Sequence, residues 1–274
     1  MGKFDGVLIC TDLDGTLLKN DKTISCENIE AIEYFKREGG YLTFITGRLP
    51  FFVSYVFDSI QPNTPFGCAN GAGLYDGTKA EYVWTATMPD NIIELVEYID
   101  DHFPDVGIQV NTFHKTYFCK ENQTMVTFRK ATNLENIVCH YKDVHEPIAK
   151  IVFGSESDAD IKNIEKMLKA HPLADNFDFI RSERTFYEIL PKGICKGTSI
   201  IKLCDYLHVD IQKSIAIGDY NNDISMFQAA GTGIAVSNAC EDAQKAADYV
   251  TVSNEEHAIA KIIQDLENGK YTLS

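Results

Sequence analysis

The sequence predicts an α/β protein whose main domain is built on a parallel sheet. Apolar runs at residues 7–11 and 41–45 have the composition of buried strands, and a helical pattern separates them. Polar residues suited to catalysis follow both runs directly. A strand–helix–strand order with such residues at the carboxyl ends of the strands is typical of parallel α/β sheets.

The size and charge of the chain limit the classes of function. It has 274 residues, of which 45% are hydrophobic and 24% are charged, as in ordinary globular proteins of one large domain or two. The 40 acidic and 25 basic residues give a net charge of −15 and include no basic run, so we expect neither nucleic acid nor an anionic membrane as a partner. An anionic substrate would need local attraction from a metal ion and a few fixed cations.

Targeting signals and cysteine usage indicate the expected compartment. No apolar stretch approaches ~18 residues, and the N-terminus lacks the apolar core of a signal peptide, so we expect no transmembrane helix and no export. The eight cysteines are scattered and form no C-x-x-C pair, which is typical of reduced, mostly buried thiols. The expected location is the cytoplasm.

The first strand ends in two carboxylates, Asp12 and Asp14. Side chains at positions i and i+2 of a strand share a face, so both carboxylates are expected to point to one spot beyond the strand end. Two close carboxylates repel each other unless a cation lies between them or one is protonated. The pair therefore indicates a Mg²⁺ site, or an acid/base group beside a nucleophile. The plain alternative is an Asp-Gly turn without chemistry.

A helix capped by Ser25 and ended by Gly39 and Gly40 connects the first strand to the second. The second strand is followed by Thr46-Gly47-Arg48. The hydroxyl can donate to a phosphate oxygen, the glycine allows close backbone approach, and the guanidinium offers a planar fork. Three such residues alone also fit an ordinary strand-to-helix turn.

A second α/β unit interrupts the main domain. A short third strand at residues 66–69 leads to Asn70-Gly71-Ala72, which fits a plain β-turn. Short strands then alternate with helices, and no carboxylate pair stands at any of these strand ends. We therefore expect a main domain at residues 1–83 and 189–274 and an inserted cap at 84–188, which could exclude water and select the substrate. The cap helices are expected near residues 89–102, 124–131, 134–140 and 158–170.

Two further segments carry charged groups to element ends. Lys196 opens the helix that follows the insertion, where the lysine charge and the helix dipole reinforce each other. A lone lysine is more often a solvated surface charge, and Lys192 is a competing candidate that no helix follows. The strand at 214–217 ends in Gly218-Asp219, and Asn222-Asp223 opens the next helix. Such oxygen ligands suit a hard divalent cation, although Asp223 alone also fits an N-cap.

These four segments, in this order, resemble the four motifs of the haloacid dehalogenase superfamily. The Asn70-Gly71-Ala72 turn is common in the branch that carries a cap after the third strand. The resemblance covers essentially the whole chain and is closest to Cof-type, sugar-phosphatase-like hydrolases with a C2-class cap. It implies a doubly wound, Rossmann-like parallel-sheet core with an inserted α+β cap.

The resemblance also implies a mechanism, that of a Mg²⁺-dependent phosphatase acting on sugar phosphates or similar small phosphomonoesters. Asp12 would attack phosphorus to form an aspartyl-phosphate, and Asp14 would protonate the leaving group and then activate water. Lys196 would offset negative charge. The implied Mg²⁺ ligands are Asp12, Asp14 through its backbone carbonyl, and Asp219, with Asp223 in support. The implied phosphate-binding residues are Leu13, Thr46, Gly47, Arg48, Asn222 and Asn238.

Several alternatives stay open at this point. A mutase-like enzyme that transfers the phosphoryl group to a second sugar would carry the same residues. A non-catalytic regulator that binds a phosphorylated metabolite is less favoured because Asp14 and Asp219 are intact. The expected partner is a small phosphorylated metabolite, and the protein could be a monomer or a homodimer. Candidate specificity residues in the cap, each more simply explained as plain surface, are Asn111, His114, Lys115 and Arg129.

Overall fold

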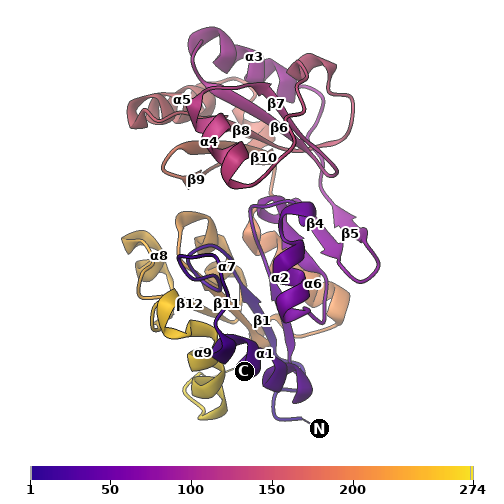
Figure 1. Ribbon diagram of the computed structural model, residues 1–274, viewed down its shortest axis with the longest axis vertical. Helices are drawn as coiled ribbons and strands as arrows, with labels where there is room; N and C mark the ends of the chain where they lie inside the picture. The colour runs from indigo at the N-terminus through magenta and orange to yellow at the C-terminus, as the bar shows by residue number, and fades with distance from the viewer. Residues whose placement is uncertain (1, 272, 274) are drawn as a thin grey trace. The chain divides into compact units, whose positions relative to one another are not determined.

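Each of two units of the chain is organised by a sheet of five strands (Figure 1). The computed structural model describes residues 2–271 and Leu273. The first unit runs to Trp84 and resumes at Cys195, and the second unit spans Thr85–Ile194. The second unit ends later than the expected cap boundary at residue 188, because strand β10 (Phe186–Pro191) belongs to its sheet.

The sheet of the first unit is parallel throughout. The strand order places β1 between β2 on one side and β11 on the other, so the winding direction reverses at β1. Ligands of open α/β sheets bind at such a reversal, beyond the carboxyl ends of the strands. The strands, in spatial order, are β13 (Tyr249–Val250), β12 (Thr232–Ala235), β11 (Ser214–Gly218), β1 (Leu8–Thr11) and β2 (Tyr41–Phe44).

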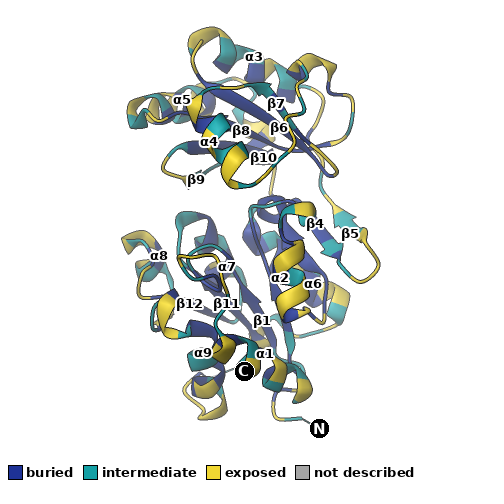
Figure 2. Cartoon of the chain, in the orientation of Figure 1, coloured by how far each residue is buried: buried dark blue, intermediate teal, exposed yellow. Residues whose placement is uncertain are grey.

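The register of β1 and β11 brings two predicted site residues to the same level. Thr11, the last residue of β1, pairs with Ile217 of β11. Asp12 and Asp219 therefore leave neighbouring strands at one edge of the sheet. Figure 2 shows both strands as buried over their whole length, so this edge of the sheet is attached to the close-packed core of the unit.

Helices of the first unit pack in two pairs, α1 with α9 and α6 with α7. Their apolar faces bury residues such as Ile32, Phe35 and Ile262 in one continuous core with the strands. The doubly wound α/β core expected from the sequence is confirmed. The helices are α1 (Cys26–Arg37), α2 (Ser54–Ile60), α6 (Lys196–Leu207), α7 (Ile224–Ala229), α8 (Glu241–Ala246) and α9 (Ala258–Glu267).

The third strand of the chain, β3 (Phe66–Cys68), forms a separate small sheet with β4 (Gly73–Asp76) and β5 (Glu81–Thr85). It pairs antiparallel with β4, and only an isolated parallel bridge between Ile45 and Gly67 links it to the end of β2. The turn after β3 consequently lies beside the residues that follow β2.

The second unit is an α+β fold with an antiparallel sheet. Its own core gathers Ile99, Val110, Phe153 and Leu168 from helices and strands. The strands, in spatial order, are β7 (Thr116–Lys120), β6 (Gly107–Thr112), β8 (Ile148–Gly154), β10 and β9 (Phe177–Glu183). The helices are α3 (Ile92–His102), α4 (Gln123–Ala131) and α5 (Asp158–Ala170).

One local prediction is wrong. Residues 134–140 are not helical: the carbonyl of Ile137 accepts a hydrogen bond from the N–H of Phe118, so this segment runs along the edge strand β7 instead. Tertiary pairing overrides the local helical pattern here. Near the C-terminus, a capping box of Ser253 and Glu256 opens a short 3₁₀ turn, Asn254–Glu256, and α9 begins after His257, whose φ is 60°.

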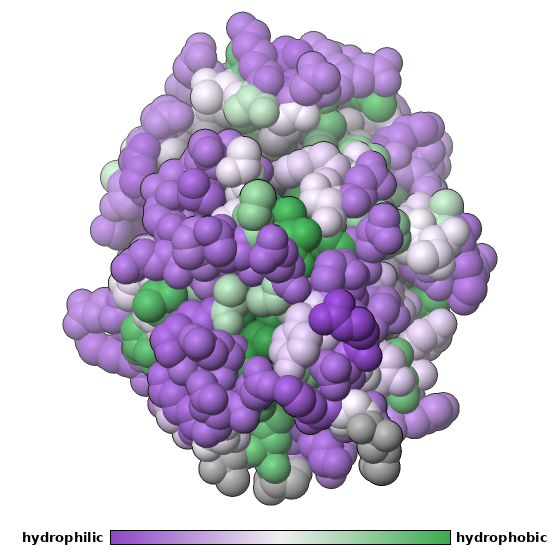
Figure 3. All heavy atoms as spheres, turned by 60° about the horizontal axis from the view of Figure 1, so that its bottom comes forward, coloured by the Kyte–Doolittle hydropathy of each residue, from purple (hydrophilic) through white to green (hydrophobic). Residues whose placement is uncertain are grey.

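One face of the molecule is largely polar (Figure 3). Figure 3, which brings the end with α1 and α9 toward the viewer, shows a mostly hydrophilic face with small hydrophobic patches. Among the described residues, no helix combines the length and apolar character that crossing a bilayer requires.

Candidate active site

Asp12 stands directly beyond β1 and is almost completely buried, with 6% of its surface exposed. Its backbone N–H donates to the carbonyl of Ile217, which continues the parallel ladder by one residue and fixes the start of the turn. Its Oδ1 accepts a hydrogen bond of 2.6 Å from Lys196 Nζ. Within the described part of the chain, no group donates a hydrogen bond to Oδ2, so one carboxylate oxygen is unengaged.

Lys196 is the first residue of α6, and its side chain is 1% exposed. Its ammonium group donates to Asp12 Oδ1 and, at 2.5 Å, to Asp223 Oδ1. Burial lowers the pKa of Lys196, but the two carboxylates outweigh this effect and hold the pKa above its usual value. The lysine is therefore charged and compensates two buried acids at once.

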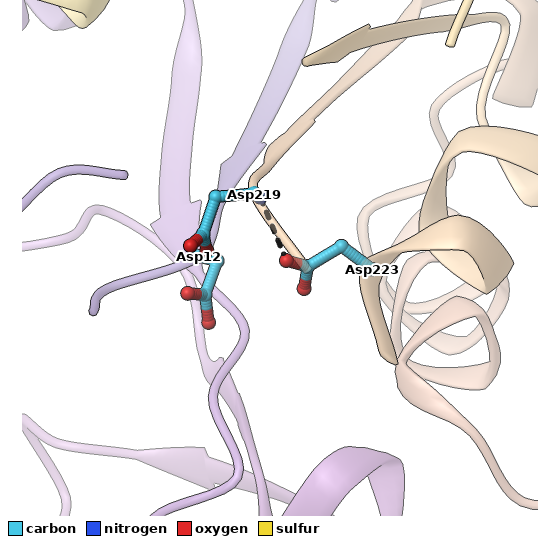
Figure 4. A group of neighbouring side chains, drawn as sticks. All are labelled: Asp12, Asp219 and Asp223. Carbon is cyan, nitrogen blue, oxygen red and sulfur yellow. Dashed lines mark hydrogen bonds between the residues drawn. The ribbon is translucent and has the colours of Figure 1, made fainter. Parts of the chain in front are cut away.

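Asp219 and Asp223 flank the turn that follows β11 (Figure 4). Asp223 is fully buried, and its Oδ2 accepts hydrogen bonds from the N–H groups of Asp219 and Tyr220 at 2.9 and 3.0 Å. Both of its oxygens are thus occupied by the protein. Burial, reinforced by the charge of Asp223, raises the pKa of Asp219 to about 7.

Asp12, Asp219 and Asp223 form a cluster that fits a divalent cation. One oxygen from each carboxylate lies within 4.8 Å of the others. Burial raises the pKa of Asp12, and the nearby charges of Asp223 and Asp219 raise it further, whereas Lys196 lowers it. The net effect is a raised pKa, which shows that the single charge of Lys196 does not compensate three buried or partly buried acids. Hard oxygen ligands of this kind suit Mg²⁺. Asp12 and Asp219 are the better direct ligands because the oxygens of Asp223 already accept hydrogen bonds.

The turn from Asp12 to Leu17 is shaped by Gly15, whose φ is 78°. A Cβ atom at this position would lie 2.5 Å from Asp219 Oδ2, so only glycine lets the two loops approach this closely. Thr16 donates its hydroxyl to Asp219 Oδ1 at 3.2 Å. The first and fourth sequence motifs are therefore in direct contact.

Asp14 points to a different set of cations. Arg48 donates to it through Nε and Nη2 at 2.9 and 2.7 Å, and Lys22 Nζ donates at 2.8 Å. Partial burial raises the pKa of Asp14, but Arg48 and Lys22 outweigh this and hold the pKa below its usual value. Its carboxylate is not part of the three-acid cluster, so the expectation that both acids point to one spot is wrong. The chain has left the strand after Thr11, and the i, i+2 rule does not hold in the following turn.

The residues after β2 form a turn that packs against Asn70. Thr46 is buried, and its Oγ1 accepts a hydrogen bond from the N–H of Arg48. Gly47 packs against the side chain of Asn70, to which Asn222 Nδ2 donates at 3.2 Å. The structure therefore groups Thr46, Gly47, Arg48 and Asn222 around one turn.

Two predicted phosphate-binding residues, Leu13 and Asn238, make contacts within the protein. The Leu13 side chain is fully buried in the apolar core, which leaves only its backbone for a ligand. Asn238 donates to the carbonyl of Gly15 at 2.8 Å and accepts from the N–H of Asn254 at 2.9 Å. Asn238 thus connects the Gly15 turn to the backbone of Asn254.

Sequence reasoning did not find Lys22, because it belongs to a polar surface turn without a motif. The only local signal is its position eight residues after Asp14, in a polar turn.

Three candidate specificity residues of the second unit have defined surroundings. Asn111 is 1% exposed, so it is not a surface residue. Lys115 forms an ion pair with Glu146, and Arg129 forms one with Glu121.

The family of this chain follows from its similarity to known proteins. A model of haloacid dehalogenase-like hydrolases matches residues 9–263, which is nearly the whole chain. The chain belongs to the haloacid dehalogenase-like hydrolases. The expected family and its Cof-type phosphatase branch are confirmed, as is the prediction of an enzyme of the phosphatase class.

Individual relatives match this haloacid dehalogenase-like hydrolase along nearly their full length. It is 30% identical over 294 residues to the 5-amino-6-(5-phospho-D-ribitylamino)uracil phosphatase YwtE of Bacillus subtilis, covering 96% of this chain and 99% of the relative. A haloacid dehalogenase-like hydrolase from Bacteroides thetaiotaomicron has a similar structure, with a TM-score of 0.81 and 25% identity over 96% of this chain and 100% of that one. The sugar phosphatase BT4131 of HAD subclass IIB shares the fold, with a TM-score of 0.83 and 22% identity over 95% of this chain and 98% of that one.

Proposed function

We propose that the chain is a Mg²⁺-dependent phosphatase that hydrolyses small phosphomonoesters through an aspartyl-phosphate on Asp12. The observation that carries this proposal is the buried Asp12 carboxylate, with Oδ1 fixed by Lys196 and Oδ2 free of hydrogen bonds from the described residues. A carboxylate held in this way, beside a cation-binding cluster, is equipped to act as a nucleophile.

In the first half of the reaction, Asp12 Oδ2 attacks the phosphorus atom and forms a new P–O bond. The bond from phosphorus to the ester oxygen breaks, and the leaving oxygen takes a proton from the Asp14 carboxyl group. Lys196 and the hydroxyl of Thr46 stabilise the negative charge of the phosphoryl oxygens while the bond to the leaving group breaks.

In the second half, a water molecule attacks the same phosphorus atom and gives a proton to the Asp14 carboxylate. The bond between phosphorus and Asp12 breaks, which releases inorganic phosphate and restores both carboxyl groups to their starting states. The pairing of Asp14 with Arg48 and Lys22 suits this half, because it favours the ionised form that accepts a proton. The first half requires a protonated Asp14, so this pairing must loosen when substrate binds.

The residues that would hold Mg²⁺ belong to the acidic cluster and to the turn after β1. Asp12 and Asp219 would be ligands through their carboxylates, with Asp14 contributing its backbone carbonyl and Asp223 supporting from its hydrogen-bonded position. When bound, the cation would neutralise these acids, keep Asp12 ionised and reduce its repulsion with the phosphate dianion.

The substrate that we propose is a phosphorylated sugar, sugar alcohol or related polar metabolite. The relative YwtE is named for a substrate that carries a phosphoribityl group, and BT4131 is described as a sugar phosphatase. We further propose that the second unit, Thr85–Ile194, serves as the cap that selects among such esters. A cytoplasmic location is part of the same proposal, since these metabolites are intracellular.

The proposal is tested with a panel of phosphorylated sugars, sugar alcohols and nucleotides, by measuring inorganic phosphate release with Mg²⁺ and with EDTA. We expect release from at least one sugar or sugar-alcohol phosphate with Mg²⁺, and a loss of at least about 100-fold with EDTA. An Asp219→Asn chain should lose the response to Mg²⁺, whereas Asp242→Asn, an exposed acid on α8, should keep it. Equal rates with Mg²⁺ and EDTA would contradict the metal assignment, and no release from any ester would contradict the phosphatase.

A further inference from the structure

A strained turn follows β3 in the first unit. Ala69, Asn70 and Gly71 have φ angles of 50°, 55° and 102°, so three successive residues adopt the left-handed region. All three are buried. For residues other than glycine this conformation costs roughly 1 kcal/mol or more each, and it persists only where the surroundings enforce it. The turn is therefore held in place by its neighbours.

One set of neighbours is the phosphate-binding segment after β2. The N–H of Asn70 donates to the carbonyl of Thr46 at 3.1 Å, and the N–H of Ala69 donates to the carbonyl of Arg48 at 3.0 Å. Between these two bonds, a Cβ atom on Gly47 would lie 3.0 Å from Asn70 Oδ1. The strained turn thus fixes the backbone of Thr46-Gly47-Arg48 from behind.

The same turn contacts the two other segments of the site. Asn70 Oδ1 accepts a hydrogen bond of 3.2 Å from Asn222 Nδ2, which belongs to the loop that carries Asp219 and Asp223. A Cβ atom on Gly71 would lie 1.9 Å from the carbonyl oxygen of Cys195, the residue before Lys196. The backbone of the turn and the start of α6 are therefore in van der Waals contact.

We propose that Asn70 is a positioning residue that holds the phosphate-binding turn and the Asn222 loop in one fixed arrangement, while the neighbouring Gly71 packs against the start of α6. Its side chain contacts Asn222 and Gly47, while the Asp12 carboxylate accepts its hydrogen bond from Lys196. Asparagine suits the position because it tolerates a positive φ better than other residues with side chains and also supplies the acceptor for Asn222. This inference rests on the proposed function, since the arrangement serves to bind a phosphoryl group.

The test uses Asn70→Gly, which keeps the left-handed backbone and removes only the side chain. Three quantities are compared with the wild-type chain in Mg²⁺: the melting temperature, the Kd of inorganic phosphate, and kcat/KM for the best ester of the panel. We expect the Kd to rise and kcat/KM to fall by about 10- to 100-fold, the range for misplacement on the order of 1 Å, with the protein still folded. Asn133→Gly, at an exposed residue with a φ of 52°, is the matched control and should change neither the phosphate Kd nor kcat/KM.

A cycle with Asn222→Ala separates positioning from a general loss of structure. If the two side chains act through their mutual contact, the double variant should lose less phosphate affinity than the product of the single losses. Should Asn70→Gly not fold, Asn222→Ala alone provides the phosphate measurement with the turn intact. An unchanged phosphate Kd in the variants would overturn the inference. A wild-type chain that binds phosphate but hydrolyses no ester would overturn the proposed function instead, and the comparison of Kd values would still decide the role of Asn70.

Discussion

Asp12→Asn is expected to abolish phosphatase activity while leaving the fold intact. The amide is nearly isosteric with the carboxylate and keeps an oxygen that can accept the hydrogen bond from Lys196, but it cannot form the phosphoryl bond. Losses on removal of a nucleophile reach about 10⁴-fold or more in kcat. The measurement is phosphate release under saturating substrate, with circular dichroism to confirm folding.

The exposed residue Asp242 offers a control for this substitution, because Asp242→Asn makes the same chemical change away from the site and should keep the wild-type rate. An Asp12→Asn chain that turns over within a few-fold of wild type would show that another group attacks phosphorus. In that case Asp12 would act only as a metal ligand.

Lys196→Met is expected to have the largest effect on stability. The substitution keeps the length of the side chain but leaves Asp12 and Asp223 buried without their shared cation. Removing one partner of a buried ion pair typically costs about 3–5 kcal/mol. We expect a clear fall in the urea midpoint of the first unit in EDTA, part of which Mg²⁺ should restore because it supplies positive charge to the same acids. Activity should fall as well, since the charge at the phosphoryl oxygens is lost.

A matched control for Lys196 is Lys36→Met in the same unit. Lys36 Nζ donates to the carbonyls of Ile60 and Gln61 and pairs with the exposed Glu33, but no buried acid depends on it. Its loss should cost roughly 1–3 kcal/mol, the usual net value of two hydrogen bonds, which is less than we expect for Lys196→Met. Equal urea midpoints for Lys196→Met and the wild-type chain would contradict the role assigned to the buried lysine.

The sequence predicted the convergence of Asp12, Asp219, Asp223 and Lys196 because each stands at the end of a regular element. A parallel sheet brings the carboxyl ends of its strands to one edge, and a helix start follows from its periodic pattern. Such rules locate Cα atoms with little knowledge of the surroundings. These rules predicted the positions at this site correctly because β1 and β11 are buried, and burial specifies the register of paired strands.

The directions of side chains in the loops were not accessible by the same rules. Asp14 turns toward Arg48 and Lys22 because the backbone after Thr11 is a turn, and its geometry depends on Gly15 and on a loop that is distant in sequence. The turn at Asn70 fitted an ordinary β-turn, yet its three left-handed residues and its contacts with Thr46 and Asn222 arise only from tertiary packing. Local patterns carry no information about such contacts.

The most direct test of the account is to trap the phosphorylated enzyme. With p-nitrophenyl phosphate, whose leaving group needs no proton, an Asp14→Asn chain should be phosphorylated but should lack the base that activates water. We predict that acid quenching in Mg²⁺, followed by peptide mass spectrometry, finds one phosphoryl group on Asp12 together with one equivalent of p-nitrophenol. Release of p-nitrophenol with Asp12 unmodified, or a phosphoryl group on any other residue, would contradict the account.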